Sequence, residues 1–540
     1  MRFSIIVFTF VVSFISVTEH VHSSETETKR PNILFVFSDD HACHAIGAYN
    51  GWLKSVNPTP NIDQLASQGM LFKNSFCTNS ICGPSRAVIQ TGKFSHLNGF
   101  MRNGNNFDGS QQTFPKLLQT AGYKTAIIGK WHLKSEPQGY DYWDVLRGQG
   151  DYYNPVLLNK DGKREVEGYC TDIVTDLAVD WLNKNKDSEQ PFMLMCQHKA
   201  PHRTWMPPLR YLDLYNDIDM PIPATLFDKQ TDNAACVQLE EMEVDRHMNL
   251  VSDLFVDPSG DTKNDGNGDV SGARNLKKMT KEQLAAWNAG FNDENREMVE
   301  AGLTGDDLVR WKYLRYIKNY LRCVRGVDDS VGSLMKCLEE TGLDKNTIVI
   351  YCSDQGFYLG DHGWYDKRFM YEESLKMPFI VKWPGTIKPG TINKNLVQNL
   401  DYAQTFLDIA GAKQPDDMQG QSLVPLFKGE SSVQWRDAIY YHYYEFPREH
   451  MVSRHYGVRD SRYKLIHFYQ FDQWELYDLE KDPDELNNEY ANPKYGNEIS
   501  RLKKRLTDLR EQYKDDSDVS VQSEQWQREM FQRLETKKSG

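Results

Sequence analysis

Two pairs of oxygen-bearing side chains follow apolar runs in the sequence and could together bind a metal ion. Asp39 and Asp40 end the run "NILFVFSDD", and Asp354 and Gln355 follow "TIVIYCS". Taken alone, an aspartate at such a place more often starts a loop or caps a helix. Three carboxylates brought together repel one another unless a cation neutralises them. Because these donors are hard oxygens and no cysteine–histidine cluster has zinc-site spacing, calcium or magnesium is the expected ion.

Lysines and histidines near other apolar runs offer the groups that an anionic ester requires. Lys130 and His132 lie two residues apart in "GKWH", so on an extended chain their side chains would project to the same side. His198 and His202 lie in "HKAPH", and Lys367 lies in "WYDKR". Each of these residues is singly more often structural than catalytic. Together, two lysines and two histidines around a dication suit charge neutralisation and protonation of a leaving group.

The elements that must position these residues alternate along the chain. Four apolar runs, each typical of a strand buried on both faces, carry the residues at their ends: 31–40, 124–132, 191–202 and 346–356. Helical patterns lie between and beside them at 59–69, 114–122, 173–185 and 308–342. This alternation predicts an α/β fold with a large, mainly parallel sheet sandwiched by helices. In such folds ligands bind where the carboxyl ends of the strands converge.

Composition and hydrophobic pattern divide the chain into three parts. Residues 1–24 contain an apolar run too short for a comfortable membrane span, which predicts a signal peptide with no clear cleavage site. Residues 25–430 are the expected catalytic domain, and its polar segment near 225–306 is interpreted as a flexible surface insertion rather than a calcium loop. Aromatic alternating runs and a charged helix near 495–515 predict a C-terminal α+β subdomain at 431–540.

Length, charge and cysteine content limit the classes of protein. The 540 residues suit one large core and a smaller one. A formal net charge of −13 argues against nucleic acid or an anionic membrane surface as a partner. No later segment has the ~20 apolar residues of a membrane helix. Nine cysteines are too few for a disulfide scaffold, and their odd number leaves at least one thiol unpaired. We expect a secreted or periplasmic protein without a membrane span.

The stretch "CGPSR" at 82–86 contains a cysteine that by itself would be half of a disulfide or a small buried residue. Followed by "A-x-x-x-T-G-K", it resembles the signature of the type I sulfatases of the alkaline-phosphatase-like superfamily, in which this cysteine is oxidised to formylglycine. The blocks "NILFVFSDD", "GKWHL" and "SDQGFYLGDHGWYDKR" resemble that family's metal-binding and sulfate-binding blocks, in the same order, over residues of about 30 to 515. Gln90 and Lys93 depart from the signature's commonest residues, but neither is the Cys, Pro or Arg on which the modification depends. Gln355 stands where many members have Asn or His and can still offer an oxygen to a metal.

The resemblance implies a mechanism. Cys82, as formylglycine hydrated to a geminal diol, would attack the sulfur of the ester beside one calcium ion, and His132 would remove the remaining hydroxyl proton so that sulfate leaves and the aldehyde re-forms. The implied metal ligands are Asp39, Asp40, Cys82, Asp354 and Gln355. The resemblance gives four other residues catalytic roles. Arg86 would steady the diol and the metal, and Lys130 and Lys367 would hold sulfate oxygens. His202 would protonate the alcohol, with His198 as second choice. A formylglycine-generating enzyme or an anaerobic sulfatase-maturating enzyme is the implied partner.

The expected substrate is a sulfated oligosaccharide or polysaccharide. The sequence around "GKWHL" and "DQGFYLGDHGWYDKR" is similar to that of bacterial polysaccharide sulfatases and of glucosamine-6-sulfatases. Glycosaminoglycans, mucin glycans and algal polysaccharides such as ulvan or carrageenan all fit this class. Five aromatic residues beyond "GKWH" could stack on sugar rings or could equally belong to the core: Tyr140, Tyr142, Trp143, Tyr152 and Tyr153.

Two other functions are compatible with the same fold. A phosphodiesterase or phosphonate hydrolase of the superfamily would have a Thr or Ser nucleophile, or a second metal cluster rich in His and Asp, and neither is found in the sequence. An inactive, glycan-binding homologue would have lost the cysteine, a metal-binding aspartate or Lys130, and all of these are present. The sequence therefore predicts an active sulfuric ester hydrolase.

Overall fold

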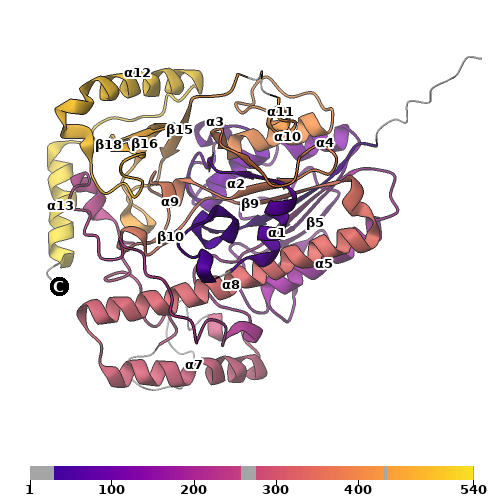
Figure 1. Ribbon diagram of the computed structural model, residues 1–540, viewed down its shortest axis with the longest axis horizontal. Helices are drawn as coiled ribbons and strands as arrows, with labels where there is room; N and C mark the ends of the chain where they lie inside the picture. Colours follow the sequence, from indigo (N-terminus) through magenta and orange to yellow (C-terminus); the bar gives the residue numbers. More distant parts are fainter. Residues whose placement is uncertain (1–28, 57, 257–274, 431, 433, 539–540) are drawn as a thin grey trace, which may run out of the picture.

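A ten-stranded sheet lies at the centre of the computed structural model, which describes residues 29–538 apart from 57, 257–274, 431 and 433 (Figure 1). In sheet order its strands are β13 (Thr391–Asn393), β2 (Met70–Phe72), β12 (Phe379–Lys382), β9 (Thr347–Ser353), β1 (Asn32–Ser38), β8 (Phe192–Gln197), β4 (Lys124–Gly129), β5 (Tyr142–Leu146), β6 (Val156–Asn159) and β7 (Gly162–Glu165). The strands β9, β1, β8, β4 and β5 are adjacent and parallel. The four predicted strands are therefore neighbours, and their carboxyl ends lie along one edge.

The central strands are apolar throughout because both faces of the sheet are covered. In β1, Phe35 packs into one hydrophobic cluster, whereas its neighbours Leu34 and Val36 pack into the other. Figure 1 shows the long helix α8 running across one face, beside α5. The helices of that face are α1 (Pro60–Gln68), α5 (Cys170–Asn185) and α8 (Gly305–Thr341), and those of the opposite face are α2 (Cys82–Thr91), α4 (Phe114–Thr120) and α10 (Tyr402–Ile409). The predicted α/β fold class is confirmed.

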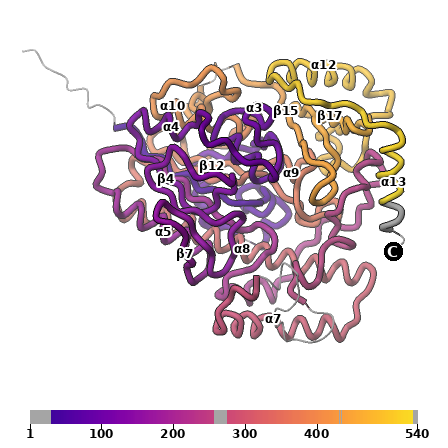
Figure 2. Tube along the Cα trace, turned by 180° about the vertical axis from the view of Figure 1, so that it is seen from behind, coloured from indigo at the N-terminus to yellow at the C-terminus, as the bar shows by residue number. Residues whose placement is uncertain are grey.

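A smaller antiparallel sheet near the C-terminus packs on the large core (Figure 2). Its strands are β15 (Ala438–Tyr443), β16 (His455–Asp460), β17 (Tyr463–Phe468) and β18 (Gln473–Asp478). Helix α12 (Gly496–Gln512) covers one face through Leu502, Leu506 and Leu509. Tyr441 and Phe468 on the other face belong to the large core's cluster. The predicted α+β element is present, whereas its boundary at residue 431 stays a prediction.

The polar segment near 225–306 contains more regular and buried structure than its polar sequence predicts. Helix α7 (Lys281–Ala301) begins with a capping box formed by Thr280 and Gln283, and it buries Trp287 and Phe291 in the core. Upstream, several apolar residues of the segment, among them Cys236, are fully buried. The run "DPSGDTKNDGNGDVSG" and the predicted signal peptide lie outside the described residues.

The cysteines and the helices bear on two further expectations. All nine cysteines are buried and free, so the chain has no disulfide in this structure. Across the described ranges, no helix combines the length and the apolarity that crossing a membrane would require.

Candidate active site

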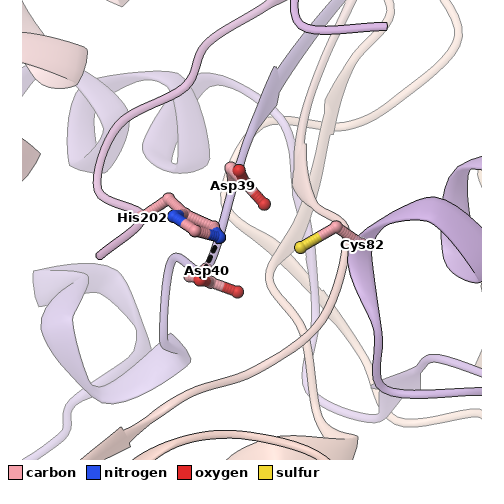
Figure 3. A group of neighbouring side chains, drawn as sticks. All are labelled: Asp39, Asp40, Cys82 and His202. Atoms are coloured by element: carbon pink, nitrogen blue, oxygen red, sulfur yellow. Dashed lines mark ion pairs between the residues drawn. The ribbon is translucent and has the colours of Figure 1, made fainter. Parts of the chain in front are cut away.

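The ends of β1 and β8 and the start of α2 bring four potential metal ligands together (Figure 3). One ligand atom from each of Asp39, Asp40, Cys82 and His202 lies within 4.8 Å of the other three. The two aspartates follow β1 directly, Cys82 is the first residue of α2, and His202 lies in the loop after β8. The predicted convergence of strand ends is therefore present in the fold.

Unusual backbone conformations at the strand ends allow the site residues to approach one another. Asp40 has a φ of 65°, in the left-handed region, and its amide donates a hydrogen bond to Asp354 Oδ1 over 3.1 Å. This contact joins the end of β1 to the end of β9. At the end of β4, Gly129 has a φ of 99°, and a Cβ there would lie 1.9 Å from the backbone oxygen of Gln197. Only glycine fits at that point of close approach between β4 and β8.

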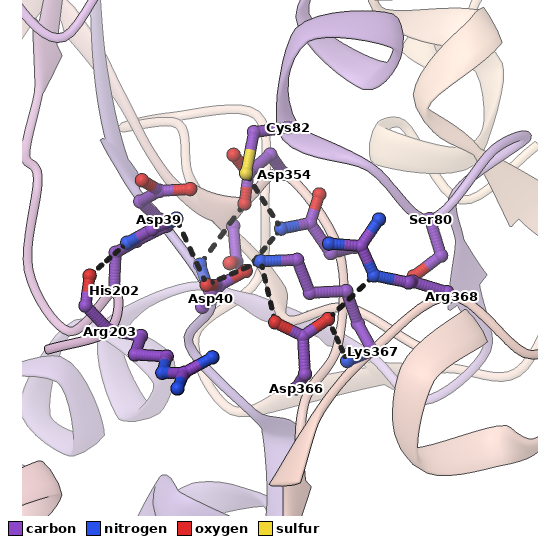
Figure 4. A network of polar contacts seen from close by, with 12 residues as sticks. Asp39, Asp40, Ser80, Cys82, His202, Arg203, Asp354, Asp366, Lys367 and Arg368 are labelled. Carbon is purple, nitrogen blue, oxygen red and sulfur yellow. Dashed lines mark hydrogen bonds and ion pairs between the residues drawn. The ribbon is translucent and has the colours of Figure 1, made fainter. Parts of the chain in front are cut away.

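Each of the three buried carboxylates has a cationic partner from another part of the chain, and Figure 4 shows one of these pairs, Lys367 with Asp40. Lys130 pairs with Asp39. Lys367 Nζ lies 2.7 Å from Asp40 Oδ2. The guanidinium of Arg86 donates to Asp354 Oδ2 through Nε at 3.2 Å and Nη2 at 3.0 Å. The expected repulsion between the carboxylates is thus offset by three cations of the chain itself.

Two oxygen atoms of the cluster are buried without a hydrogen-bond partner in the described structure. They are Asp39 Oδ1 and Gln355 Oε1, while Gln355 Nε2 donates to Asp40. An unpaired buried oxygen costs free energy unless something binds it. Both Asp354 oxygens, in contrast, already accept hydrogen bonds from Asp40 and Arg86. Arg86 Nη2 lies 3.8 Å from Asp39 Oδ1, which is too far for a hydrogen bond. The two oxygens are of the donor type that a hard cation prefers, so the residues present fit such an ion.

Cys82 is held at the edge of this cluster. Its side chain is 1% exposed, and Gln355 Nε2 lies 3.6 Å from its Sγ. Burial raises the pKa of the Cys82 thiol far above its usual value, although Lys367 opposes the effect. The unmodified side chain is therefore a neutral thiol at neutral pH, which is a poor nucleophile.

The three candidate histidines have different environments. His202 reaches the cluster, with Nε2 3.9 Å from Asp40 Oδ2. His198 does not, because its Nε2 lies 3.0 Å from the hydroxyl of Ser330 on α8 and the ring is fully buried. His132 has a φ of 56°, and its buried Nδ1 has no hydrogen-bond partner among the described residues. β4 ends at Gly129, so Lys130 and His132 lie beyond the strand and the extended chain assumed for them is absent.

Burial and neighbouring cations keep the two histidines near the cluster neutral. The pKa of His132 is held well below its usual value by burial and then by Lys130 and Arg86. Burial and three lysines do the same for His202, with Lys130 the largest of the three. A neutral imidazole can accept a proton, which suits a general base.

Cys82 lines a cavity of about 780 Å³. Several other residues of its wall were not predicted from the sequence to be site residues. Cys82, His202 and Lys367 line it together with Lys199, Arg203, Asp366, Arg368 and Asn103. Lys199 lies inside the motif "HKAPH", and Asp366 and Arg368 flank Lys367, so proximity in sequence to a selected residue was the available signal. Asn103 gives no such signal.

The five aromatic residues beyond "GKWH" do not line this cavity. Tyr140, Trp143, Tyr152 and Tyr153 are buried, which confirms the alternative that they belong to the core. Two of them hold the loop after β8: Tyr152 donates a hydrogen bond to the backbone oxygen of His202, and Tyr153 to that of Pro207, each over 2.6 Å. Tyr142 is half-buried elsewhere on β5.

Comparison with known proteins identifies the family of the chain. A family model described as sulfatase matches residues 31–412, and one described as N-sulphoglucosamine sulphohydrolase, C-terminal, matches residues 360–512. An N-acetylglucosamine-6-O-sulfatase of Bacteroides thetaiotaomicron is 44% identical over 508 residues, which cover 93% of this chain and 90% of the relative.

Solved structures extend the comparison to the fold. A protein solved in complex with its substrate, D-glucosamine-2-N,6-O-disulfate, is 44% identical, with a TM-score of 0.87 and coverage of 91% of this chain and 99% of the other. Phosphonate monoester hydrolase from Silicibacter pomeroyi has a TM-score of 0.66 at 20% identity, covering 90% of this chain and 96% of its own, which shows a shared fold alone. The family match and the high identity lead to one conclusion: the chain belongs to the sulfatase family and is a sulfuric ester hydrolase.

Proposed function

We propose that this sulfatase removes the 6-O-sulfate of glucosamine residues in glycosaminoglycan-type carbohydrate. The observation that carries the proposal is the 44% identity, over almost the whole chain, to an N-acetylglucosamine-6-O-sulfatase. The similarly related protein with bound D-glucosamine-2-N,6-O-disulfate supports the same substrate class. Among the carbohydrates that fit the sequence, this relation favours glucosamine sulfates over ulvan or carrageenan.

The charges of the cavity support an anionic sugar as the ligand. Lys199 is buried on its wall and forms no ion pair with a carboxylate in the part of the chain that is described. Its ammonium lies 4.9 Å from the centre of the Tyr152 ring. A buried cation without an acidic partner is costly, and an anionic ligand would offset that cost. Asp366 and Arg368, paired over 2.9 Å, add hydrogen-bonding groups suited to sugar hydroxyls.

The proposed nucleophile is Cys82 after oxidation to formylglycine. The raised pKa of the buried thiol argues that the unmodified cysteine is not the nucleophile. The hydrated aldehyde would supply a hydroxyl for attack on sulfur. Because Cys82 is 1% exposed, a maturating enzyme could reach it only before the chain has folded. We therefore place the action of the proposed partner, a formylglycine-generating or anaerobic sulfatase-maturating enzyme, before folding.

The proposed metal is one calcium ion held by Asp39, Asp40, Asp354, Gln355 and modified Cys82. Asp39 Oδ1 and Gln355 Oε1, which accept no hydrogen bond from the described residues, support this assignment. The ion would add positive charge beside the sulfate group. Arg86 would hold Asp354 in place, since it binds that carboxylate through two nitrogen atoms.

Lysines and histidines of the chain would manage charge and protons. Lys130 and Lys367 lie beside the cluster and would bind sulfate oxygens. His132, neutral and with a free buried nitrogen, would accept the proton on the Cys82 side. His202 would protonate the departing alcohol. The bound sulfate would oppose the effect of the nearby lysines on the pKa of His202, so substrate binding would favour its protonated form.

Export to the periplasm or medium is proposed from the sequence of residues 1–24.

The substrate assignment predicts a clear order of rates. We expect sulfate release from N-acetylglucosamine 6-sulfate and from glucosamine-2-N,6-O-disulfate to exceed that from N-acetylgalactosamine 6-sulfate by at least about 100-fold in kcat/KM, since a polar site discriminates against misplaced hydroxyls. Ion chromatography of released sulfate measures the rates. Faster release from a 2-O-sulfated uronic acid or from ulvan would overturn the assignment.

The metal assignment predicts dependence on calcium. Exhaustive treatment with EGTA should lower kcat by at least about 100-fold, and added Ca²⁺ should restore it. Elemental analysis should find calcium in the wild-type protein and in the control variant Asp172→Asn, whose carboxylate belongs to an exposed ion pair, but not in Asp39→Asn. Full activity in a calcium-free preparation would refute the assignment.

The two histidines of "HKAPH" provide a matched pair of variants. His202→Gln should lower kcat on N-acetylglucosamine 6-sulfate by about 10²–10⁴-fold, because the alcohol would leave without a proton. His198→Gln should change kcat by less than about 3-fold, because this ring hydrogen-bonds to Ser330 away from the cavity. Steady-state measurement of kcat for both variants shows which of the two histidines acts as the acid. The opposite order would transfer the role of acid to His198.

A further inference from the structure

We propose that the ion pair between Arg203 and Asp253 positions His202 for proton transfer, so that the polar segment at 225–306 is a structural support of the active site. The inference rests on the proposed role of His202 as the acid. It assigns a function to a segment that the sequence analysis interprets as a surface insertion.

The orientation of the His202 ring depends on its neighbour in sequence. His202 Nδ1 contacts the backbone oxygen of Arg203. A carbonyl oxygen only accepts hydrogen bonds, so Nδ1 carries a proton here. The other nitrogen, Nε2, then faces Asp40 at 3.9 Å and is the atom available to the substrate. Any shift of the Arg203 carbonyl would therefore rotate or displace Nε2.

The side chain of Arg203 fixes that carbonyl to the segment. Its guanidinium donates to both oxygens of Asp253, from Nε over 2.7 Å and from Nη2 over 2.8 Å. Asp253 is fully buried and also accepts a hydrogen bond from the amide of Asn249 over 2.9 Å. The guanidinium lies 5.0 Å from the centre of the Tyr365 ring. A buried, two-point contact of this kind sets both the distance and the direction of the arginine.

The segment holds the same loop at a second point. Asn275 Nδ2 donates to the hydroxyl of Thr204 over 2.8 Å. Asp253 and Asn275 thus bind adjacent residues of the loop. Tyr152 also donates a hydrogen bond to this loop, at the backbone oxygen of His202. Figure 4 shows Arg203 directly beside His202, at the edge of the polar network. The loop that carries His202 is thereby held both by the segment and by Tyr152.

A double-mutant cycle separates positioning from general stabilisation. Asp253→Asn keeps the size of the side chain but weakens the two-point contact, and it should lower kcat on N-acetylglucosamine 6-sulfate by about 10–100-fold, with KM within about 3-fold. Introduced into His202→Gln, the same substitution should cost less than about 3-fold more, because the group that it positions is already absent. The control Asp172→Asn breaks an exposed two-point contact with Arg210 and should leave kcat within about 2-fold.

The outcomes separate the role of His202 as the acid from its positioning by the Arg203–Asp253 ion pair. A full additional loss in the His202→Gln background, or no loss from Asp253→Asn alone, would overturn the positioning role. If His202→Gln itself keeps wild-type kcat, the proposed acid is wrong and the inference fails with it. Should Asp253→Asn not fold, Arg203→Lys keeps the charge and removes the fork, and the same cycle and the same criteria apply to it.

Discussion

The structure depends on keeping three buried carboxylates together at one edge of the central sheet. Asp39, Asp40 and Asp354 follow adjacent parallel strands, so their approach is a consequence of the topology. Their charges are offset by Lys130 after β4, Arg86 from α2 and Lys367 after the short strand β11 (Tyr365–Asp366). A buried charge without a partner is very costly, so each ion pair also fixes the element that supplies its cation.

That arrangement explains why such an anionic protein can attract an anionic ester. The net charge of −13 is spread over the whole chain, whereas the carboxylates at the centre of the site are individually paired. Lys199 adds a buried cation on the cavity wall. Burial, reinforced by nearby cations, holds the pKa of His132 and of His202 well below the usual value. In the proposed mechanism a bound sulfate would oppose the effect of those cations. One set of charges thus governs both binding and proton transfer in the proposed mechanism.

The central strands and the meeting of their ends could be predicted from the sequence, because both depend on the order of residues within short stretches of the chain. The apolar runs that end at Asp39 and Asp354 identify buried strands, and neighbouring parallel strands bring their ends together. What the sequence could not predict depends on contacts between distant segments. The φ values of Gly129 and His132 turn the chain after β4, which an extended-strand interpretation misses. The contact between Arg203 and Asp253 likewise joins residues 50 positions apart, with no periodic signal.

The central claim is that Cys82, buried beside the carboxylates, becomes the nucleophile by oxidation to formylglycine. Mass spectrometry of the tryptic peptide 74–86 from active enzyme tests it most directly. The peptide also contains Cys77, which is fully buried and serves as an internal control. The account predicts a mass about 18 Da below that of the dithiol form, with the change located at residue 82, as expected when a thiol becomes an aldehyde. An active enzyme in which both cysteines are unmodified would contradict it.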